Sequence, residues 1–322
     1  MTTEIYPIEA YSTFRRQHLF TEHERIPTDH YHAGIVVSQG DVCLATAVLY
    51  INPHIQYKNT RVGVVGAYGA VEDKEAVACL FRAIEKLARE AGLDFLIGPM
   101  NGSTWEDYRF HDHPEKQLFF MEMKHPPYYP NQWKSVGFKP VANYSSTIAP
   151  LVAQGNSNIG AVKNRLIRDG ITFRVIDIEN YEADLKKLHP FLHRSFKQNL
   201  LYTPLSESSF LAKYLPLRTV LRPDFVQIAE HKGEVVGVSL GVDNLLDPAT
   251  PSLIIKTLAR SPQPLYRGLG VVLLDEFYSM GLANGYRQLI CAFMIEGGDA
   301  LPLSDRYKAH TLKTYTLYGK PI

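Results

Sequence analysis

The sequence predicts two α/β domains in tandem, and three observations support this fold class. A chain of 322 residues has about the length of two domains. Its apolar content of 45% can fill two cores. The same order of elements, a hairpin, a strand, a helix and a strand, occurs once in each half. The alternative interpretation is one large mixed α/β domain.

The first half contains the first copy of this order, after an irregular stretch with His and Tyr residues. Its helix is predicted from apolar residues at helical spacing, including Leu80, Ile84 and Leu87. Gly92 suits the C-terminal cap of this helix. The expected elements are a hairpin of residues 34–38 and 42–50, a strand at 61–68, a helix at 75–91, a strand at 93–98, a short helix near 132–135 and a strand at 144–148.

The second half repeats the order. A polar, turn-prone run, Gln154-Gly155-Asn156-Ser157-Asn158, suits a linker, so we expect domains at residues 1–155 and 156–322. The expected elements are a strand at 172–177, helices at 181–197 and 207–221, a hairpin of 225–230 and 235–242, a strand at 253–259, a helix at 271–283 and strands at 288–294 and 311–318.

Composition narrows the possible partners and the location. The 34 Lys and Arg residues nearly balance the 33 Asp and Glu residues, so no charge pattern typical of binding to nucleic acid or an anionic membrane is present. Cys43, Cys79 and Cys291 occur singly in apolar runs, which is typical of buried thiols in a reducing compartment. The N-terminus lacks the order of a secretory signal and no run of eighteen apolar residues occurs, so we expect a cytoplasmic protein with no nucleic-acid or membrane partner.

The most specific local feature is the run Leu265-Tyr266-Arg267-Gly268-Leu269-Gly270, between an apolar strand and an apolar helix. Gly268 and Gly270 allow a tight turn and a close approach of the backbone to a ligand. The N–H groups that open the next helix can then hold a pyrophosphate, and Arg267 can add a charged contact. The pattern lacks the third glycine of a Rossmann motif and the Lys-Ser/Thr of a Walker loop. An ordinary strand-to-helix turn is the alternative.

In this context the second half, from Thr172 onward, resembles the GCN5-related N-acetyltransferase (GNAT) superfamily, whose pyrophosphate loop commonly reads Gln/Arg-x-x-Gly-x-Gly/Ala. Gly268 and Gly270 match this pattern, whereas Leu265 departs from its first residue. The first half resembles the same superfamily, and its run 133–138 (Trp-Lys-Ser-Val-Gly-Phe) is similar to the Tyr-x-x-x-Gly-Phe pattern. The resemblance implies two tandem GNAT-like acyl-CoA acyltransferase domains, each with a mixed, mostly antiparallel sheet flanked by helices.

The resemblance also implies where the co-substrate, acetyl-CoA or another acyl-CoA, binds. In the first half the matching loop carries Glu72, Asp73 and Glu75, whose carboxylates would repel a pyrophosphate, so we expect no cofactor there. The cofactor-binding residues are expected in the second domain. They are Ala259, Arg267, Gly268, Leu269, Gly270 and Val271.

The chemistry implied is direct attack by an acceptor amine on the acyl thioester. This needs a base for the amine and an acid for the leaving thiolate. Glu296, just after a strand, is the candidate base; a surface carboxylate is the other interpretation. Ser304 aligns with the tyrosine that acts as the acid in many relatives, and Tyr307 lies three residues further on.

Two segments of the first half, 98–109 and 126–131, combine hydrogen-bonding side chains with aromatic rings, as small-molecule pockets do. The alternative is a well-packed loop. The candidate substrate-binding residues are Asn101, Ser103, Trp105, Tyr108, Arg109 and Tyr129. The runs His111-Asp112-His113 and Asp29-His30-Tyr31-His32 lack the spacing of a metal site, so we expect no metal.

Together these features predict an acyl-CoA-dependent N-acyltransferase, most simply an acetyltransferase, for an amine-bearing small molecule or peptide bound between the halves. One alternative is a non-catalytic GNAT-like ligand-binding protein. Another is a Fem-like aminoacyltransferase that uses charged transfer RNA, against which the neutral charge balance argues. The sequence does not predict the oligomeric state.

Overall fold

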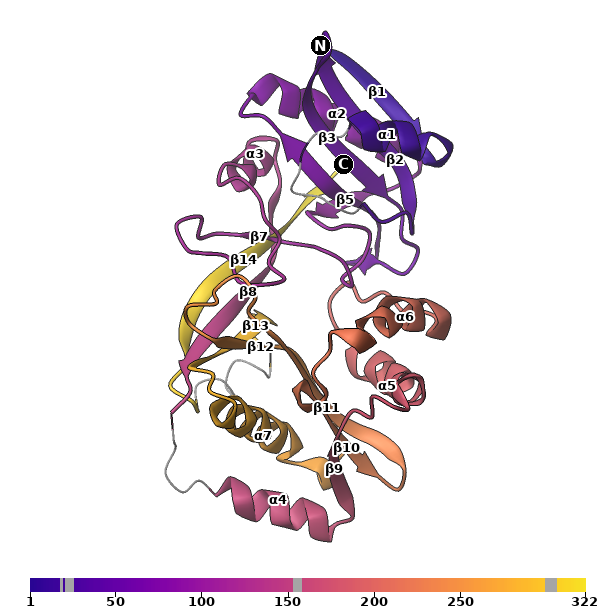
Figure 1. Ribbon diagram of the computed structural model, residues 1–322. Helices are drawn as coiled ribbons and strands as arrows, with labels where there is room; N and C mark the ends of the chain where they lie inside the picture. The colour runs from indigo at the N-terminus through magenta and orange to yellow at the C-terminus, as the bar shows by residue number, and fades with distance from the viewer. Residues whose placement is uncertain (18–19, 21–25, 153–157, 299–305) are drawn as a thin grey trace. The chain divides into compact units, whose positions relative to one another are not determined.

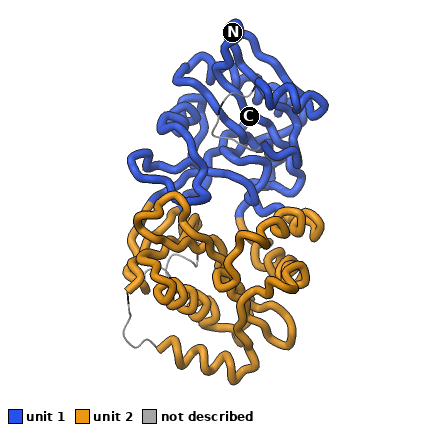
Figure 2. Tube along the Cα trace, in the orientation of Figure 1, with its two compact units in different colours: residues 1–144, 200–203, 313–322 blue, residues 145–199, 204–312 orange. Residues whose placement is uncertain are grey.

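A computed structural model describes residues 1–17, 20, 26–152, 158–298 and 306–322. The chain forms two compact units (Figure 2). Unit 1 comprises residues 1–144, 200–203 and 313–322, and unit 2 comprises residues 145–199 and 204–312. The chain therefore passes between the units four times, whereas the sequence predicts a single linker.

Unit 1 is built on a sheet with the strand order β1-β2-β3-β5-β6-β14. The pair β5 and β6 is parallel, while the pairs β1/β2, β2/β3, β3/β5 and β6/β14 are antiparallel. Its elements are β1 (Thr2–Pro7), α1 (Tyr11–Gln17), β2 (Tyr31–Gln39), β3 (Val42–Tyr50), β4 (Gln56–Tyr57), β5 (Thr60–Ala70), α2 (Lys74–Glu90), β6 (Phe95–Gly98), β7 (Phe110–His111), α3 (Tyr129–Ser135), the first part of β8 (Lys139–Pro150) and most of β14 (His310–Pro321).

Helices cover both faces of the sheet in unit 1. On one face, Ile35 of β2, the buried apolar side of α2 and the fully buried Trp133 of α3 belong to one hydrophobic core. The adjacent Gly34 points to the other face, where a Cβ atom would lie 2.5 Å from the ring of Phe14 on α1. The close approach of α1 therefore requires glycine at position 34.

Unit 2 has the strand order β8-β13-β12-β11-β10-β9 (Figure 1). The pair β12 and β13 is parallel, and the pairs β9/β10, β10/β11 and β11/β12 are antiparallel. Its elements are the end of β8, α4 (Ile159–Arg168), β9 (Ile171–Val175), α5 (Tyr181–Phe196), α6 (Glu207–Tyr214), short 3-10 turns at Leu215–Thr219, Pro223–Phe225 and Pro264–Tyr266, β10 (Val226–His231), β11 (Glu234–Asp243), β12 (Ser252–Arg260), α7 (Leu269–Ala283) and β13 (Gln288–Ile295).

The long helix α7 packs directly on the centre of the sheet in unit 2. A Cβ atom on Gly237 or Gly241 of β11 would lie within 3 Å of the α7 side chains Leu269, Leu273 or Phe277. Helix α5 contacts β11 and β12 as well, from the opposite face of the sheet (Figure 1). The sheet is therefore buried on both faces, which explains the near-continuous apolar runs of β11 and β12.

The predicted repeat of hairpin, strand, helix and strand is confirmed in both units. It is β2-β3-β5-α2-β6 in unit 1 and β10-β11-β12-α7-β13 in unit 2. The prediction missed five helices and strands, namely β1, α1, α4 and the two short strands β4 and β7. The predicted closing strand of the second half is β14, which pairs with β6 of unit 1 from Tyr318 to Pro321. In the described part of the chain no helix is long and apolar enough to cross a membrane.

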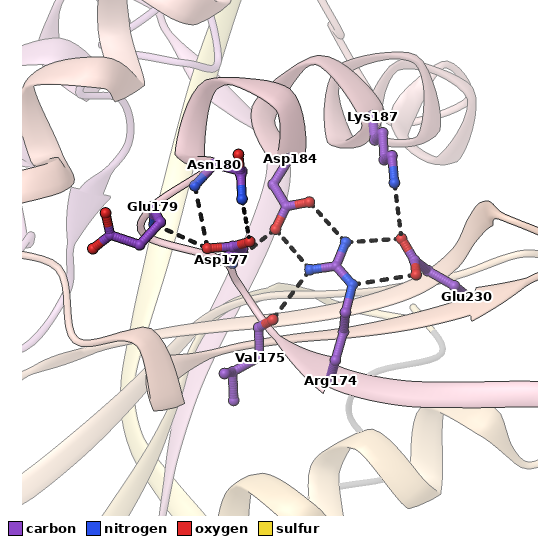
Figure 3. Close-up of polar contacts among 8 residues, drawn as sticks. All are labelled: Arg174, Val175, Asp177, Glu179, Asn180, Asp184, Lys187 and Glu230. Atoms are coloured by element: carbon purple, nitrogen blue, oxygen red, sulfur yellow. Dashed lines mark hydrogen bonds and ion pairs between the residues drawn. The ribbon is translucent and has the colours of Figure 1, made fainter.

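A charge cluster joins β9, α5 and β10 (Figure 3). The Arg174 guanidinium donates to the two carboxylate oxygens of Asp184 at 2.6 and 2.7 Å, and to those of Glu230 at 2.8 and 3.2 Å. Lys187 Nζ lies 3.7 Å from Glu230, and Asp184 also accepts a hydrogen bond from the backbone of Asp177. Because the two carboxylates lie on different elements, one side chain fixes both α5 and β10 to the edge strand β9.

Candidate active site

The parallel strands of unit 2 separate partway along their length. They pair from Ser252 and Gln288 as far as Ile255 and Cys291, yet β12 continues to Arg260 and β13 to Ile295. At this point β12 has one extra residue, Lys256, because its neighbours Ile255 and Thr257 pair with adjacent residues of β11. Such a bulge bends a strand and ends its pairing. Strands β12 and β13 thus diverge after the pair Ile255 and Cys291, and we call the position of this last pair the parting point.

The glycine loop, residues 265–270, follows β12 and leads into α7. Gly268 has a φ of +88° and precedes the first residue of α7 without a capping side chain. Its carbonyl accepts the Val272 N–H at 3.1 Å, so the N–H groups of Leu269, Gly270 and Val271 open the helix. These three donors and the positive end of the helix dipole together form an anion-binding geometry.

Helix α4 packs against the glycine loop. A Cβ atom on Gly268 would lie 2.7 Å from the Val162 side chain, so both the backbone conformation and the packing require glycine there. The Arg165 guanidinium donates a hydrogen bond to the carbonyl of Arg267. On the other side, the Tyr266 hydroxyl lies 2.9 Å from His231 Nδ1 of β10. The loop is thus held from two directions while the Arg267 side chain is exposed.

Unit 1 has the same bulge and the same parting of strands, but its own side chains bond the backbone beyond that point. Between Thr46 and Val48 of β3, strand β5 has one extra residue, and its pairing with β6 ends at Val64. The Ala67 N–H donates to Asn101 Oδ1 at 2.7 Å, and the Ala70 N–H donates to the Tyr129 hydroxyl at 3.1 Å.

Two further side chains continue this pattern in unit 1. The Tyr128 hydroxyl donates to the Ala70 carbonyl at 3.1 Å, and Gln132 Nε2 donates to the Val71 carbonyl at 2.7 Å. At the start of α2, the Asp73 carboxylate accepts the N–H groups of Glu75 and Ala76. The first N–H groups of α2 thus have a side-chain acceptor, whereas no side chain among the described residues caps α7.

The six predicted cofactor-binding residues lie close together along the chain, at the end of β12 and the start of α7. Ala259 is buried on β12, and Arg267 is exposed. The Leu269 side chain is fully buried in the core beneath α7, so only its backbone can face a ligand. Gly268, Gly270 and Val271 contribute backbone groups at the helix end.

The predicted catalytic residues have different surroundings. Glu296 is exposed and follows β13 directly. Ser304 lies outside the described residues. Tyr307 is only 3% exposed, and its ring stacks on Tyr278 with centroids 4.6 Å apart. Its hydroxyl donates to Asp275 of α7 at 3.3 Å. Burial, and secondarily the Asp275 charge, raises the pKa of Tyr307, so its hydroxyl is protonated at neutral pH.

Cys291 lies at the parting point, as the last paired residue of β13. Burial raises the pKa of its thiol to about 12, while the neighbouring Thr147 hydroxyl has the smaller, opposite effect. A thiol with this pKa is not a nucleophile at neutral pH. The parting point of unit 2 therefore carries a neutral Cys side chain.

The predicted substrate-binding residues all lie in unit 1 and make structural contacts there. Besides the bonds of Asn101 and Tyr129 to β5, the Trp105 indole donates to the Thr203 carbonyl at 2.7 Å. Ser103 Oγ accepts a hydrogen bond of 3.3 Å from the backbone N–H of Trp105. The Arg109 guanidinium lies 3.9 Å from the ring centre of Tyr108 and 4.4 Å from that of Tyr144. A role of these residues in substrate binding stays a prediction.

In the first histidine cluster, the backbone N–H of His111 donates to His125 Nε2 at 3.0 Å, and His113 Nε2 lies 3.1 Å from the Thr314 hydroxyl. Burial, followed by the nearby His125, lowers the pKa of His111 to about 3, so it is neutral at pH 7. Among the residues that the structure describes, no group of three His, Cys, Asp or Glu side chains could hold a metal ion.

Sequence reasoning missed Arg165, which contacts the glycine loop from α4. The signal available was the spacing of Ile159, Val162 and Leu166, one apolar face of a helix, with Arg165 next to it. The preceding polar run made the segment look like part of a linker. The long-range contact between α4 and the loop could not be read from local pattern.

Solved structures similar to this chain were found. One is the glucosamine N-acetyltransferase region of a fungal multi-domain GH3 β-N-acetylglucosaminidase, with 13% identity, a TM-score of 0.58 and a match to 99% of this chain and 38% of that one. A GCN5-related N-acetyltransferase from Sphaerobacter thermophilus is 12% identical, with a TM-score of 0.55 over 99% of this chain and 95% of that one.

A tandem GNAT protein from the clavulanic acid biosynthesis pathway is 9% identical, with a TM-score of 0.53 over 99% of this chain and 98% of that one. Our chain spans well under half of the first of these proteins and nearly all of the other two. Neither protein-family models nor curated protein sequences gave a match. The structural matches extend over both units, and the chain therefore has the fold of the GCN5-related N-acetyltransferase superfamily.

Proposed function

We propose that this protein is an N-acyltransferase that moves an acyl group, most simply acetyl, from coenzyme A to an amine of a small molecule or peptide. The observation that carries the proposal is the open N-terminus of α7, next to the parting point of β12 and β13. The GNAT fold supports it, because the structurally similar proteins include N-acetyltransferases. Unit 2 is the proposed site.

The residues at the glycine loop fit the phosphates of coenzyme A. Three backbone N–H groups open the helix, and Gly268 has no side chain to block them. The exposed Arg267 adds a positive charge at the same place. Beyond the parting point, the backbone of β12 at residues 257–260 can exchange hydrogen bonds with the amide groups of the pantetheine arm.

The bound coenzyme supplies an acyl group activated as a thioester. The protein's own part in the reaction is to orient this group and to remove a proton from the acceptor amine. We propose Glu296 as that base, since its carboxylate is exposed just after β13, beyond the parting point.

Calorimetric titration with acetyl-CoA tests the cofactor site. We expect one binding site per chain, and we expect Arg267→Glu to weaken binding about tenfold or more, because it replaces an attractive charge with a repulsive one. Arg287→Glu is the matched control. Arg287 is also exposed and has the same charge, but it lies beyond the far end of the 15-residue α7, about 20 Å away.

No heat at millimolar acetyl-CoA would contradict the proposal, as would equal weakening by both substitutions. Turnover is measured by release of free thiol in the presence of a panel of amines, including amino sugars. Glu296→Gln should lower kcat about a hundredfold without changing acetyl-CoA affinity. Binding without thiol release for any amine would indicate a non-catalytic ligand-binding protein.

A further inference from the structure

The glycine loop lacks one side chain that the GNAT pattern leads us to expect. Its first position is Leu265, which is 40% exposed and has no donor. Helix α4 brings Arg165 to the same loop. Arg165 Nη2 bonds to the Arg267 carbonyl, and lies 3.9 Å from the position of a Cβ atom on Gly268. A guanidinium thus lies beside the residue that precedes the open N–H groups of α7.

The charges around this arginine favour an anion. Arg165, Arg267 and the positive end of the α7 dipole all lie at the loop. The ion pairs that the structure describes in unit 2 join other residues, and the nearby Lys163 is paired with Glu276 at 2.6 Å. Like charges held together repel one another, so a polyanion bound here would lower their energy.

We propose that Arg165 binds a phosphate group of acyl-CoA, and so supplies from α4 the side-chain contact that Leu265 cannot make. This inference rests on the proposed function, and it extends the site to α4, which precedes the segment whose sequence motifs resemble the GNAT superfamily. The guanidinium keeps further N–H donors besides the one used on the Arg267 carbonyl, and its geometry suits two phosphate oxygens.

The test compares Arg165→Met with Arg168→Met in titrations with acetyl-CoA. Both substitutions remove one positive charge from α4, but Arg168 is exposed at the end of that helix. We expect Arg165→Met to weaken binding at least tenfold, as for a lost charged hydrogen bond, and Arg168→Met to change it less than twofold. Repeating the pair with the 3′-dephospho form identifies the phosphate: a loss that persists assigns the pyrophosphate, and one that vanishes assigns the 3′-phosphate.

A rescue variant separates phosphate binding from a role in holding the loop. Adding Leu265→Arg to Arg165→Met restores a guanidinium at the first position of the loop, so we expect affinity to recover by at least threefold. A loss that this change does not reduce would mean that Arg165 only supports the loop and would overturn the inference. Unchanged affinity in Arg165→Met would also overturn the inference. In either case, acetyl-CoA binding by the wild type would still support the proposed function. Absence of wild-type binding would overturn both.

Discussion

The Oδ1 atom of Asn101 accepts a hydrogen bond of 2.7 Å from the backbone N–H of Ala67, and both residues are buried in unit 1. Ala67 lies on the strand that parts from its parallel neighbour, at the bulge. Among the described residues of unit 2, no side chain bonds the backbone of the corresponding strand β12 at residues 257–260. Two related units thus use the same backbone geometry differently.

Replacing Asn101 by Ala should destabilise the protein. The Ala67 N–H would be left buried without its acceptor, which costs about 2 kcal/mol. Urea unfolding measures this loss, with Asn131→Ala as the control because Asn131 is exposed on α3. The control should change the free energy of unfolding by less than about 0.5 kcal/mol. Equal values for the two variants would show that the bond contributes nothing.

We expect a second difference in stability between Ala substitutions at Gly268, in the glycine loop, and at Gly285. Gly268→Ala places a methyl group at a φ of +88° and 2.7 Å from Val162, so both the backbone and the packing are strained. Gly285→Ala is the control, since Gly285 has a φ of +81° but nothing within 4 Å of a Cβ atom. We expect about 1 kcal/mol of destabilisation at Gly285 and a larger loss at Gly268.

Val162→Ala removes the contacting methyl groups and should recover part of the Gly268→Ala loss. Thermal or urea unfolding of the single and double variants forms a cycle that isolates the contact. Additive losses in this cycle would contradict the close packing of α4 on the loop.

Tyr307→Phe distinguishes two roles of this residue. Its burial against Tyr278 and its bond to Asp275 favour a packing role, so we expect a loss of about 1 kcal/mol in stability and a kcat within tenfold of wild type. Rates of thiol release at saturating substrates provide the measurement. A fall of a hundredfold or more with an unchanged unfolding midpoint would instead identify Tyr307 as the acid.

The Arg174 cluster makes the stability of unit 2 depend on pH. Hydrogen bonds from Arg174 lower the pKa of Glu230 below its ordinary value of 4.5. A carboxyl group with a lowered pKa in the folded state adds stability above its unfolded pKa and loses it as the pH falls through the folded value. We therefore expect the free energy of unfolding to fall below about pH 4.5 and less steeply in Arg174→Met.

At neutral pH, Arg174→Met leaves Asp184 buried without its partner, and we expect a loss of about 2 kcal/mol or more. Lys186→Met breaks an exposed pair with Glu182 and should cost less than about 0.5 kcal/mol. Urea unfolding at several pH values measures both effects. A pH profile that is identical in wild type and Arg174→Met would contradict the role of the cluster.

Local pattern predicted much of this fold, because hairpins, amphipathic helices and helix caps depend on residues near one another in sequence. Helix α2 illustrates this, with Asp73 as its cap and apolar residues at helical spacing. Strand β1 was missed because four of its first five residues are exposed and show no apolar alternation. The glycine loop was also predicted, because its glycines and the strand and helix that flank it are neighbours in the sequence.

The parts of the site that escaped prediction depend on long-range contacts. Asn101 and Tyr129 have the polar and aromatic character of pocket residues, yet their polar atoms bond strand backbone 34 and 59 residues away. Arg165 lies 102 residues before the carbonyl that it bonds. Side-chain type alone cannot distinguish a residue that binds a ligand from one that forms hydrogen bonds with the backbone of its own sheet.

The central claim is that acyl-CoA binds at the parting point and glycine loop of unit 2 and not at the related position of unit 1. Hydrogen exchange followed by mass spectrometry, with and without acetyl-CoA, tests it directly. We expect slower exchange in peptides covering residues 256–272 and unchanged exchange in those covering residues 65–76. Protection confined to residues 65–76, or no protection at residues 256–272 under saturating acetyl-CoA, would contradict the account.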